Sequence, residues 1–225
     1  MNLTKNKKYQ YLFFFIIFIY SIFNGGNSNI VIQVNFIFVS LLFFLCIKDK
    51  NYYQHLNKFF KENKLSIFFY FLFLIYLLFQ IIPIPIENLK FFSIQKFNIL
   101  NQLNLNISYS SISLSPSNSF FQLINFITLF TFVLIIKMIF YTERHKFRFY
   151  IFLSFLGAFS SFVAVLLYLK GNPDLFFIKN SFYKDSSTGF FINRTVFSLF
   201  LLFCLVGSLQ YLKIYNNENN KNNNK

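Results

Sequence analysis

The sequence has no tryptophan, only seven acidic residues, two histidines and two cysteines in 225 residues. Cys46 and Cys204 both lie in apolar runs, which excludes a disulfide framework and favours cysteines that serve only for packing. Neither His55 nor His145 has a cysteine or carboxylate at metal-ligand spacing. We therefore expect no metal site and no cofactor, and we expect both histidines to be exposed to solvent in loops.

Charged residues are also scarce, at 12% of the chain, while 56% of the residues are hydrophobic and 39 are phenylalanine. A soluble domain carries about 25% charged residues. Polar cover for a water-soluble surface is thus missing, and the composition predicts a polytopic membrane protein. The net charge of +14 would suggest nucleic acid as the partner of a soluble protein. Here we expect no nucleic acid, because lysine and arginine in membrane proteins mark the cytoplasmic loops.

Six apolar runs are long enough, or nearly so, to cross a bilayer, which takes about 20 residues. They predict an all-α transmembrane bundle with spans at 9–23, 30–47, 65–82, 120–141, 149–169 and 195–215. The first run follows three lysines and resembles a signal peptide. Because no small-x-small cleavage site follows, we favour an uncleaved span and keep cleavage as the alternative. Residues 216–225 are polar and of low complexity, so we expect a disordered tail.

The segments between the spans are polar. Residues 48–64 are predicted to form a charged loop, and Pro83 and Pro85 end the third span. Within the long segment that follows, Glu87–Phe97 could form a short amphipathic helix at the membrane interface.

The distribution of lysine and arginine predicts the orientation of the spans. Fifteen of the 21 basic residues lie on the side of the N-terminus, and six lie on the opposite side. By the positive-inside rule both termini are then cytoplasmic. We expect the bacterial inner membrane as the location and its lipid bilayer as the first partner.

Small residues indicate which helices pack most closely, since small side chains let helix backbones approach in a membrane. Such residues recur four apart in span 149–169, and a further set occurs in the last span. The pairs are Ser154/Ala158, Gly157/Ser161, Ser160/Ala164 and Cys204/Ser208, with Gly207 beside the last. The last two spans are therefore predicted to be the closest pair.

The best candidate for a functional site is the segment 170–194, between the last two spans on the predicted outer side. It carries Lys170, Lys179, Lys184 and Arg194 against Asp174 and Asp185. The planar guanidinium of Arg194 could grip a phosphate, such as a lipid-linked diphosphate, in two-pronged fashion. The alternative is an ordinary interfacial anchor for headgroups. No histidine is available on this side as a general base, and we interpret its carboxylates as solvated, so we expect no catalytic residue.

Three segments resemble, in order, the N-terminal half of the bacterial O-antigen ligase and polymerase family. They are FQIIPIPIENLKFFS (79–93), ISLSPSNSFFQLINFITLF (112–130) and TGFFINRTVFSLFL (188–201). The third is similar to the family's Thr-Gly-x-Phe-x-Asn-x-Asn segment, although Thr195 replaces the second asparagine. The resemblance covers about residues 65–213.

The resemblance implies transfer of glycans from a polyprenyl diphosphate carrier to an acceptor on the outer side of the inner membrane. It carries over Gly189 and Asn193, with Arg194 beside them, so that Asn193, Arg194, Lys179 and Lys184 form our candidate substrate-binding set. In that family the chemistry depends on a histidine in a later periplasmic loop, which has no counterpart here. We therefore expect a truncated or split member whose second half is either lost or encoded separately, as a second half-protein. The alternative is a small membrane binding or transport component without catalysis.

Overall fold

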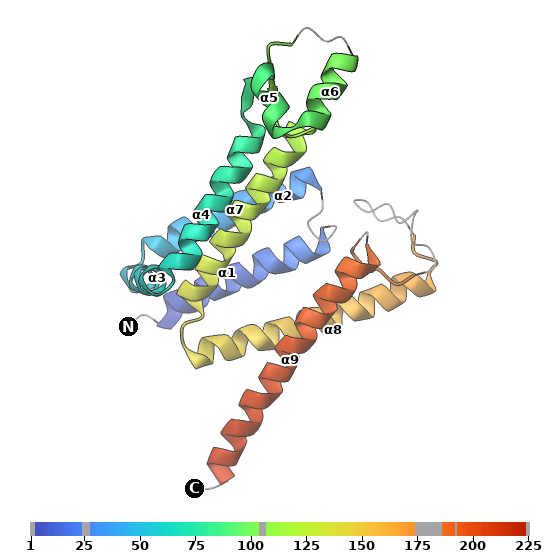
Figure 1. Cartoon of the computed structure of the whole chain (residues 1–225). Coiled ribbons are helices and arrows are strands. Elements are labelled where there is room, and N and C mark those ends of the chain that lie inside the picture. Colours follow the sequence, from blue (N-terminus) through green and yellow to red (C-terminus); the bar gives the residue numbers. More distant parts are fainter. Residues whose placement is uncertain (1–2, 24–27, 104–106, 174–185, 192, 224–225) are drawn as a thin grey trace.

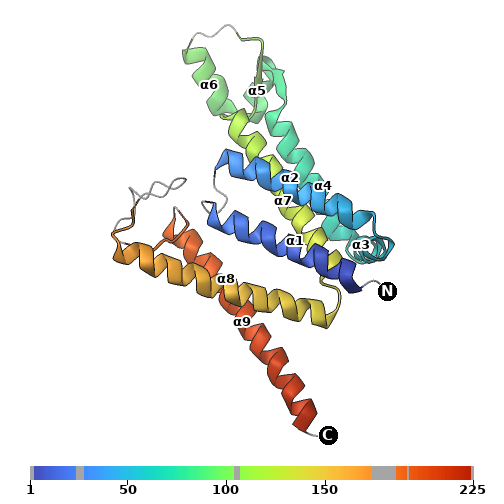
Figure 2. The same ribbon diagram turned by 180° about the vertical axis from the view of Figure 1, so that it is seen from behind.

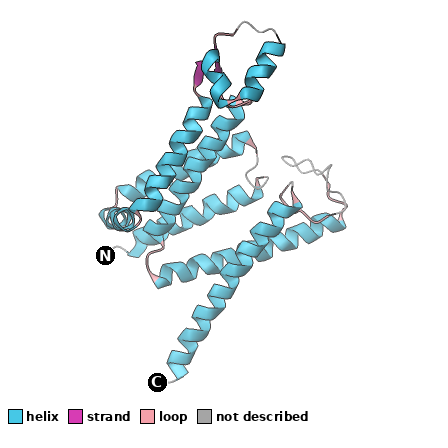
Figure 3. Ribbon diagram, viewed as in Figure 1, coloured by secondary structure: helices cyan, strands magenta, loops and turns pink. Residues whose placement is uncertain are grey.

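The computed structural model describes residues 3–23, 28–103, 107–173, 186–191 and 193–223, and these are almost entirely helical (Figures 1 and 3). Two short strands form the only sheet among the described residues. In chain order the elements are α1 (Leu3–Ile22), α2 (Asn29–Ile47), α3 (Lys50–Glu62), α4 (Lys64–Ile81), β1 (Pro83–Pro85), α5 (Ile86–Phe92), α6 (Ile94–Gln102), β2 (Tyr109–Ser111), α7 (Pro116–Ile139), α8 (Glu143–Leu169) and α9 (Arg194–Asn223).

Five of the described helices are long and apolar enough to cross a membrane: α2, α4, α7, α8 and α9 as far as Asn216. The prediction of a helical membrane protein is confirmed at this level. The first helix, α1, carries three lysines in its first turns, which shortens its apolar stretch. A sixth span there stays a prediction.

Both termini lie at the same end of the molecule as α3 and the α7–α8 turn (Figures 1 and 2). This is the end to which the charge count assigns the cytoplasm, and we call it the predicted inner end. The opposite end, with α5 and α6, is the predicted outer end.

The main core lies between α1, α2, α3 and α7. Phe13, Val39, Leu42, Ile135 and Met138 are each no more than 1% exposed there. Residues 48–64, predicted to form a loop, instead contain α3, because Asp49 caps it by accepting from the Asn51 N–H at 3.1 Å. Its apolar face is buried through Tyr52 and Leu56, so this charged segment is an amphipathic helix rather than a loop.

Helices α8 and α9 make the most extensive interhelical contact of the described elements, as the small residues predict. A Cβ added at Gly157 would lie 2.6 Å from the Cys204 Cβ, and one at Gly207 would lie 3.0 Å from the Leu153 Cβ. The two backbones are thus close enough that these positions admit only glycine without a shift. The cysteine is buried and free, in agreement with the packing role expected for it.

Phenylalanine rings join the α8–α9 pair to the rest of the molecule. Phe14 of α1 stacks on Phe152 of α8 with ring centroids 4.4 Å apart, and Phe18 meets Phe159 at 5.7 Å. One polar contact crosses the same junction, in which Arg148 Nη1 donates to Gln10 Oε1 at 3.2 Å. Aromatic side chains, rather than close backbones, hold these two groups of helices together.

The last helix continues to Asn223, through most of the tail that composition predicts to be disordered. Residues 216–223 contain no glycine or proline to end the helix, and extending an existing helix adds one hydrogen bond for each residue fixed. The structure therefore differs from the sequence expectation over 216–223, and the last two residues of the predicted tail lie outside the described residues.

Candidate functional site

A small polar cap stands at the predicted outer end, above α4 and α7 (Figure 1). It consists of β1, α5, α6 and β2. Pro83 and Pro85 end α4 and form β1, which pairs antiparallel with β2 in the register Pro83↔Ser111 and Pro85↔Tyr109. Proline is tolerated in such a strand because a two-stranded sheet has only edges. The predicted amphipathic helix at 87–97 is present as two helices, α5 and α6, which meet at Ser93.

Lys96 of α6 forms hydrogen bonds that connect two parts of this cap. Its side chain is 9% exposed, and its Nζ donates to Ser111 O and Ser113 O, both at 2.6 Å, and to Ser111 Oγ at 3.1 Å. An ammonium group has three donors, so all three are used by one loop. Burial lowers the pKa of Lys96 from its usual value, and no described carboxylate forms an ion pair with it.

A tight turn at 188–191 packs against the outer ends of α8 and α9. Gly189 has a φ of +59°, and a Cβ there would lie 3.1 Å from the Ala164 Cβ, so both the backbone conformation and the space favour glycine. Thr188 is 1% exposed, and its carbonyl accepts from the Phe191 N–H at 3.0 Å. Phe191 in turn meets Phe200 at a centroid distance of 5.0 Å.

Two of the four predicted substrate-binding residues lie directly after this turn. Asn193 accepts from the Thr195 N–H through Oδ1 at 2.8 Å, and its carbonyl accepts from the Phe197 N–H at 3.0 Å. Asn193 is thus the N-cap of α9. Arg194 is the first residue of that helix and is exposed. Lys179 and Lys184 lie outside the described residues, so the structure brings only Asn193 and Arg194 together.

Two apolar cavities lie between the helices. One, of about 410 Å³, lies between α1 and α2, and its walls include the exposed side chains of Phe15, Val34 and Phe38. The other, of about 290 Å³, lies where α1, α2, α7, α8 and α9 converge. Both are lined in part by Tyr20 and Asn35, so they adjoin one another. Neither is lined by a charged residue, which makes them suited to a hydrocarbon chain.

The histidines, expected to be solvated loop residues, are not placed that way. His145 is 9% exposed in the first turn of α8, and its Nδ1 lies 3.0 Å from the Ile139 carbonyl oxygen. His55 stacks on Tyr141 with ring centroids 3.9 Å apart. The expectation was wrong because both residues lie in helices, His55 in α3 against the end of α7 and His145 in the first turn of α8.

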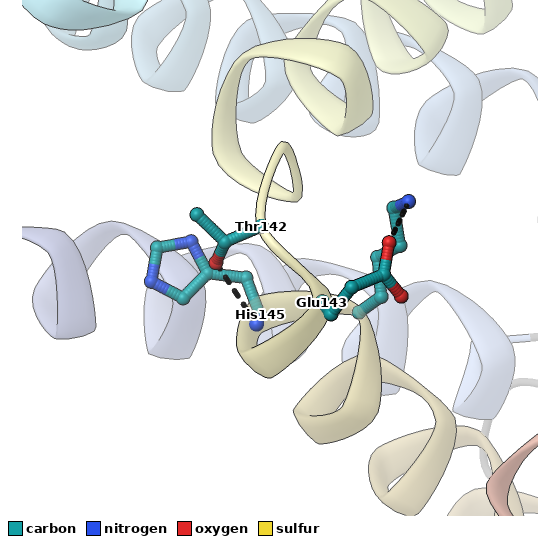
Figure 4. A network of polar contacts seen from close by, with 4 residues as sticks. Thr142, Glu143 and His145 are labelled. Carbon is teal, nitrogen blue, oxygen red and sulfur yellow. Dashed lines mark hydrogen bonds and ion pairs between the residues drawn. The ribbon is translucent and has the colours of Figure 1, made fainter. Parts of the chain in front are cut away.

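Figure 4 shows how α8 begins beside them. Thr142 Oγ1 accepts from the His145 N–H at 3.3 Å, and the Glu143 carboxylate accepts from Lys146 at 2.7 Å. The His145 ring and the Glu143 carboxylate lie on opposite sides of this first turn. Thr142 is therefore an N-cap, and α8 begins at Glu143, ahead of the predicted span 149–169.

The described residues offer binding groups but no set for proton transfer on the predicted outer side. Both histidines lie at the predicted inner end, and Glu87, in the first turn of α5, is exposed. No three described His, Cys, Asp or Glu residues are close enough together to hold a metal ion.

Sequence reasoning missed Lys96 and Thr188 as buried polar residues, and it missed Gln10 and His145 in the same way. Among these four residues, only Lys96 could have been predicted to be partly buried, because it lies in an amphipathic stretch. Burial of the others depends on which helices meet.

Comparisons of the chain with protein-family profiles, with curated proteins and with solved structures find no match. Assignment of a function therefore depends on the residues themselves.

Proposed function

We propose that the protein is a membrane component of cell-surface polysaccharide assembly, of the O-antigen ligase or polymerase type, which binds a polyprenyl diphosphate-linked glycan. Its location would be the bacterial inner membrane, with the binding groups on the outer side. The observation that carries the proposal is where the three family-like segments lie in the fold.

Those segments are far apart in the sequence, yet each forms an outer end of a helix. Segment 79–93 supplies the end of α4, β1 and α5, and segment 112–130 directly follows β2 and forms most of α7. Pairing of β1 with β2 joins these two. Segment 188–201 forms the turn around Gly189 and the start of α9. Each resemblance thus coincides with a specific structural device rather than with a featureless apolar run.

The apolar cavities support a lipid-linked ligand. A prenyl chain needs a hydrocarbon-lined space that opens to the bilayer, and the cavity between α1 and α2 has both properties. The exposed guanidinium of Arg194 at the N-terminus of α9 suits a diphosphate, because a helix N-terminus and an arginine both favour anions.

Binding is the part of this function that the described residues can perform. Glycosyl transfer needs an acid and a base near the reacting oxygen, and the chain has no histidine on the predicted outer side. We propose that a second protein, the half-protein expected from the sequence, supplies those groups.

The proposal is tested by deleting the gene and complementing it, with surface polysaccharide resolved on a gel. We expect the deletion to change the ladder of chain lengths or to leave acceptor lipid uncapped, and the wild-type gene to restore the pattern. Val34→Trp, which fills the cavity between α1 and α2, should fail to restore it. Val165→Trp, on an exposed part of α8, is the matched control and should succeed.

An unchanged ladder in the deletion strain would contradict the proposal. It would favour the second candidate, a non-catalytic membrane component that binds other lipids. The absence of charged residues from both cavities favours that candidate over a transporter of ions or polar solutes, which would place ionisable groups among its helices.

A further inference from the structure

A second cavity system lies at the predicted inner end, away from the proposed glycan site. It has a volume of about 400 Å³ and lies between α3, the end of α7 and the start of α8. We call it the interface pocket. Its polar walls include His55, Lys58, Glu62, Lys137, Tyr141 and Lys146.

The pocket combines positive charge with an apolar floor. Lys58, Lys137 and Lys146 come from three different helices, while Ile136, Phe140 and Phe149 form the apolar part. Glu62 is the only carboxylate in the lining. Burial and the neighbouring Lys58 lower the pKa of His55, which favours the uncharged ring. The lining therefore carries three positive charges and one negative charge.

The ion pairs within the chain leave the lysines of the pocket available to a ligand. Lys58 lies 3.8 Å from Glu62, and Lys146 lies 2.7 Å from Glu143 (Figure 4), but all four side chains are well exposed. Exposed pairs of this kind are worth at most about 1 kcal/mol, so an anion of higher charge density can displace them. Lys137 forms no ion pair within the described residues; its Nζ lies 5.9 Å from the centre of the Phe59 ring.

The location of the pocket in the molecule indicates which kind of anion it binds. Helix α3 is amphipathic and lies across the predicted inner ends of the spanning helices (Figure 1), where the phosphates of the lipid headgroups lie. Basic pockets between helices on this side are typical sites for anionic headgroups. Lysine serves as a point charge for phosphate, and Phe140 and Phe149 give the pocket an apolar floor.

We infer that the interface pocket binds the phosphate group of an anionic phospholipid. The site is independent of the proposed function and lies at the opposite end of the molecule.

The test measures phosphatidylglycerol binding to the purified full-length protein in detergent, by native mass spectrometry, with phosphatidylcholine as the uncharged reference. The wild-type protein should bind phosphatidylglycerol more tightly. Lys137→Gln should weaken that binding about fivefold, as expected for the loss of one lysine near a headgroup. Lys61→Gln is the matched control, because Lys61 carries the same charge on α3 without lining the pocket; it should have little effect.

A variant that is expected to tighten lipid binding distinguishes a binding effect from a folding defect. Glu62→Gln removes the competing carboxylate and should tighten phosphatidylglycerol binding, which damage to the fold would not do. Equal affinity for the two lipids in the wild-type protein, or equal effects of Lys137→Gln and Lys61→Gln, would overturn the inference. Displacement of the lipid by millimolar inorganic phosphate would overturn the lipid assignment, and it would mean that the pocket binds a soluble phosphate.

Discussion

Lys96 illustrates, at the scale of one residue, how a membrane protein can bury a cation without a counter-ion. Three oxygens of the chain, from Ser111 and Ser113, replace the water molecules that the ammonium group loses. Two of those oxygens are backbone carbonyls, which would be costly to bury unpaired. The side chain therefore connects α6 to Ser111 of β2 and to Ser113 in the segment that follows β2.

Replacing Lys96 should loosen the cap. In Lys96→Met the methylene stem is retained, but the Ser111 carbonyl loses the Lys96 donor, which costs about 1–3 kcal/mol for a carbonyl left buried. Ser113 O still accepts from Ser111 Oγ at 3.0 Å. Hydrogen exchange at residues 83–113 should then become faster, while exchange in α8 should stay unchanged. Lys90→Met, at an exposed position of the same cap, should behave as wild type. Unaltered exchange in Lys96→Met would mean that the contact does not hold the cap.

At the scale of elements, glycine and aromatic residues are used at different helix contacts. The α8–α9 pair uses Gly157 and Gly207 to bring two backbones together, whereas the junction between α1 and α8 is filled by phenylalanine. Packing of this kind matters because lipid is as apolar as the helices, and burial of apolar surface alone gives them little reason to associate.

Gly157→Ala should separate α8 from α9, because its Cβ would stand 2.6 Å from the Cys204 Cβ. Overpacking of this kind costs about 1–3 kcal/mol, and it should lower the midpoint of chemical unfolding in detergent. Cys204→Gly removes the opposing Cβ, so the double variant should regain part of the lost stability. Ala158→Val, at the neighbouring exposed position, should have a smaller effect. If the double variant is no more stable than Gly157→Ala, the clash is not the cause.

At the scale of the whole molecule, the positions of the charges and the fold agree. The described helices that are long enough to span alternate in direction, and the N-terminus, α3, the α7–α8 turn and the C-terminus share one end (Figures 1 and 2). This is the end that carries most of the lysine and arginine. Two ligand-sized environments result, one apolar and open to lipid, and one basic at the predicted inner interface.

Reporter fusions test this orientation. Alkaline phosphatase fused at Ser186, between α8 and α9, should be active, because the enzyme needs the oxidising outer compartment to form its disulfides. The same enzyme fused after Asn63, between α3 and α4, should be inactive. The reverse pattern would invert the molecule and place Arg194 in the cytoplasm, which would remove the basis for the glycan-binding proposal.

The sequence by itself determined the class of the protein and the closest helix pair. Apolar runs, the distribution of lysine and arginine, and small residues four apart are local patterns, and a helix in a membrane satisfies its own backbone hydrogen bonds whatever lies beside it. It also placed Asn193 and Arg194 at the start of the last helix.

Only the tertiary structure decided which polar residues are buried. Lys96 looks like a solvated residue until its contacts with Ser111 and Ser113 are seen, and His145 until its ring is found beside the Ile139 carbonyl. The interface pocket likewise exists only because Lys58, Lys137 and Lys146, which are up to 88 residues apart in the chain, meet where three helices converge. Sequence spacing fixes neighbours within one helix, but contacts between helices depend on how the whole bundle packs.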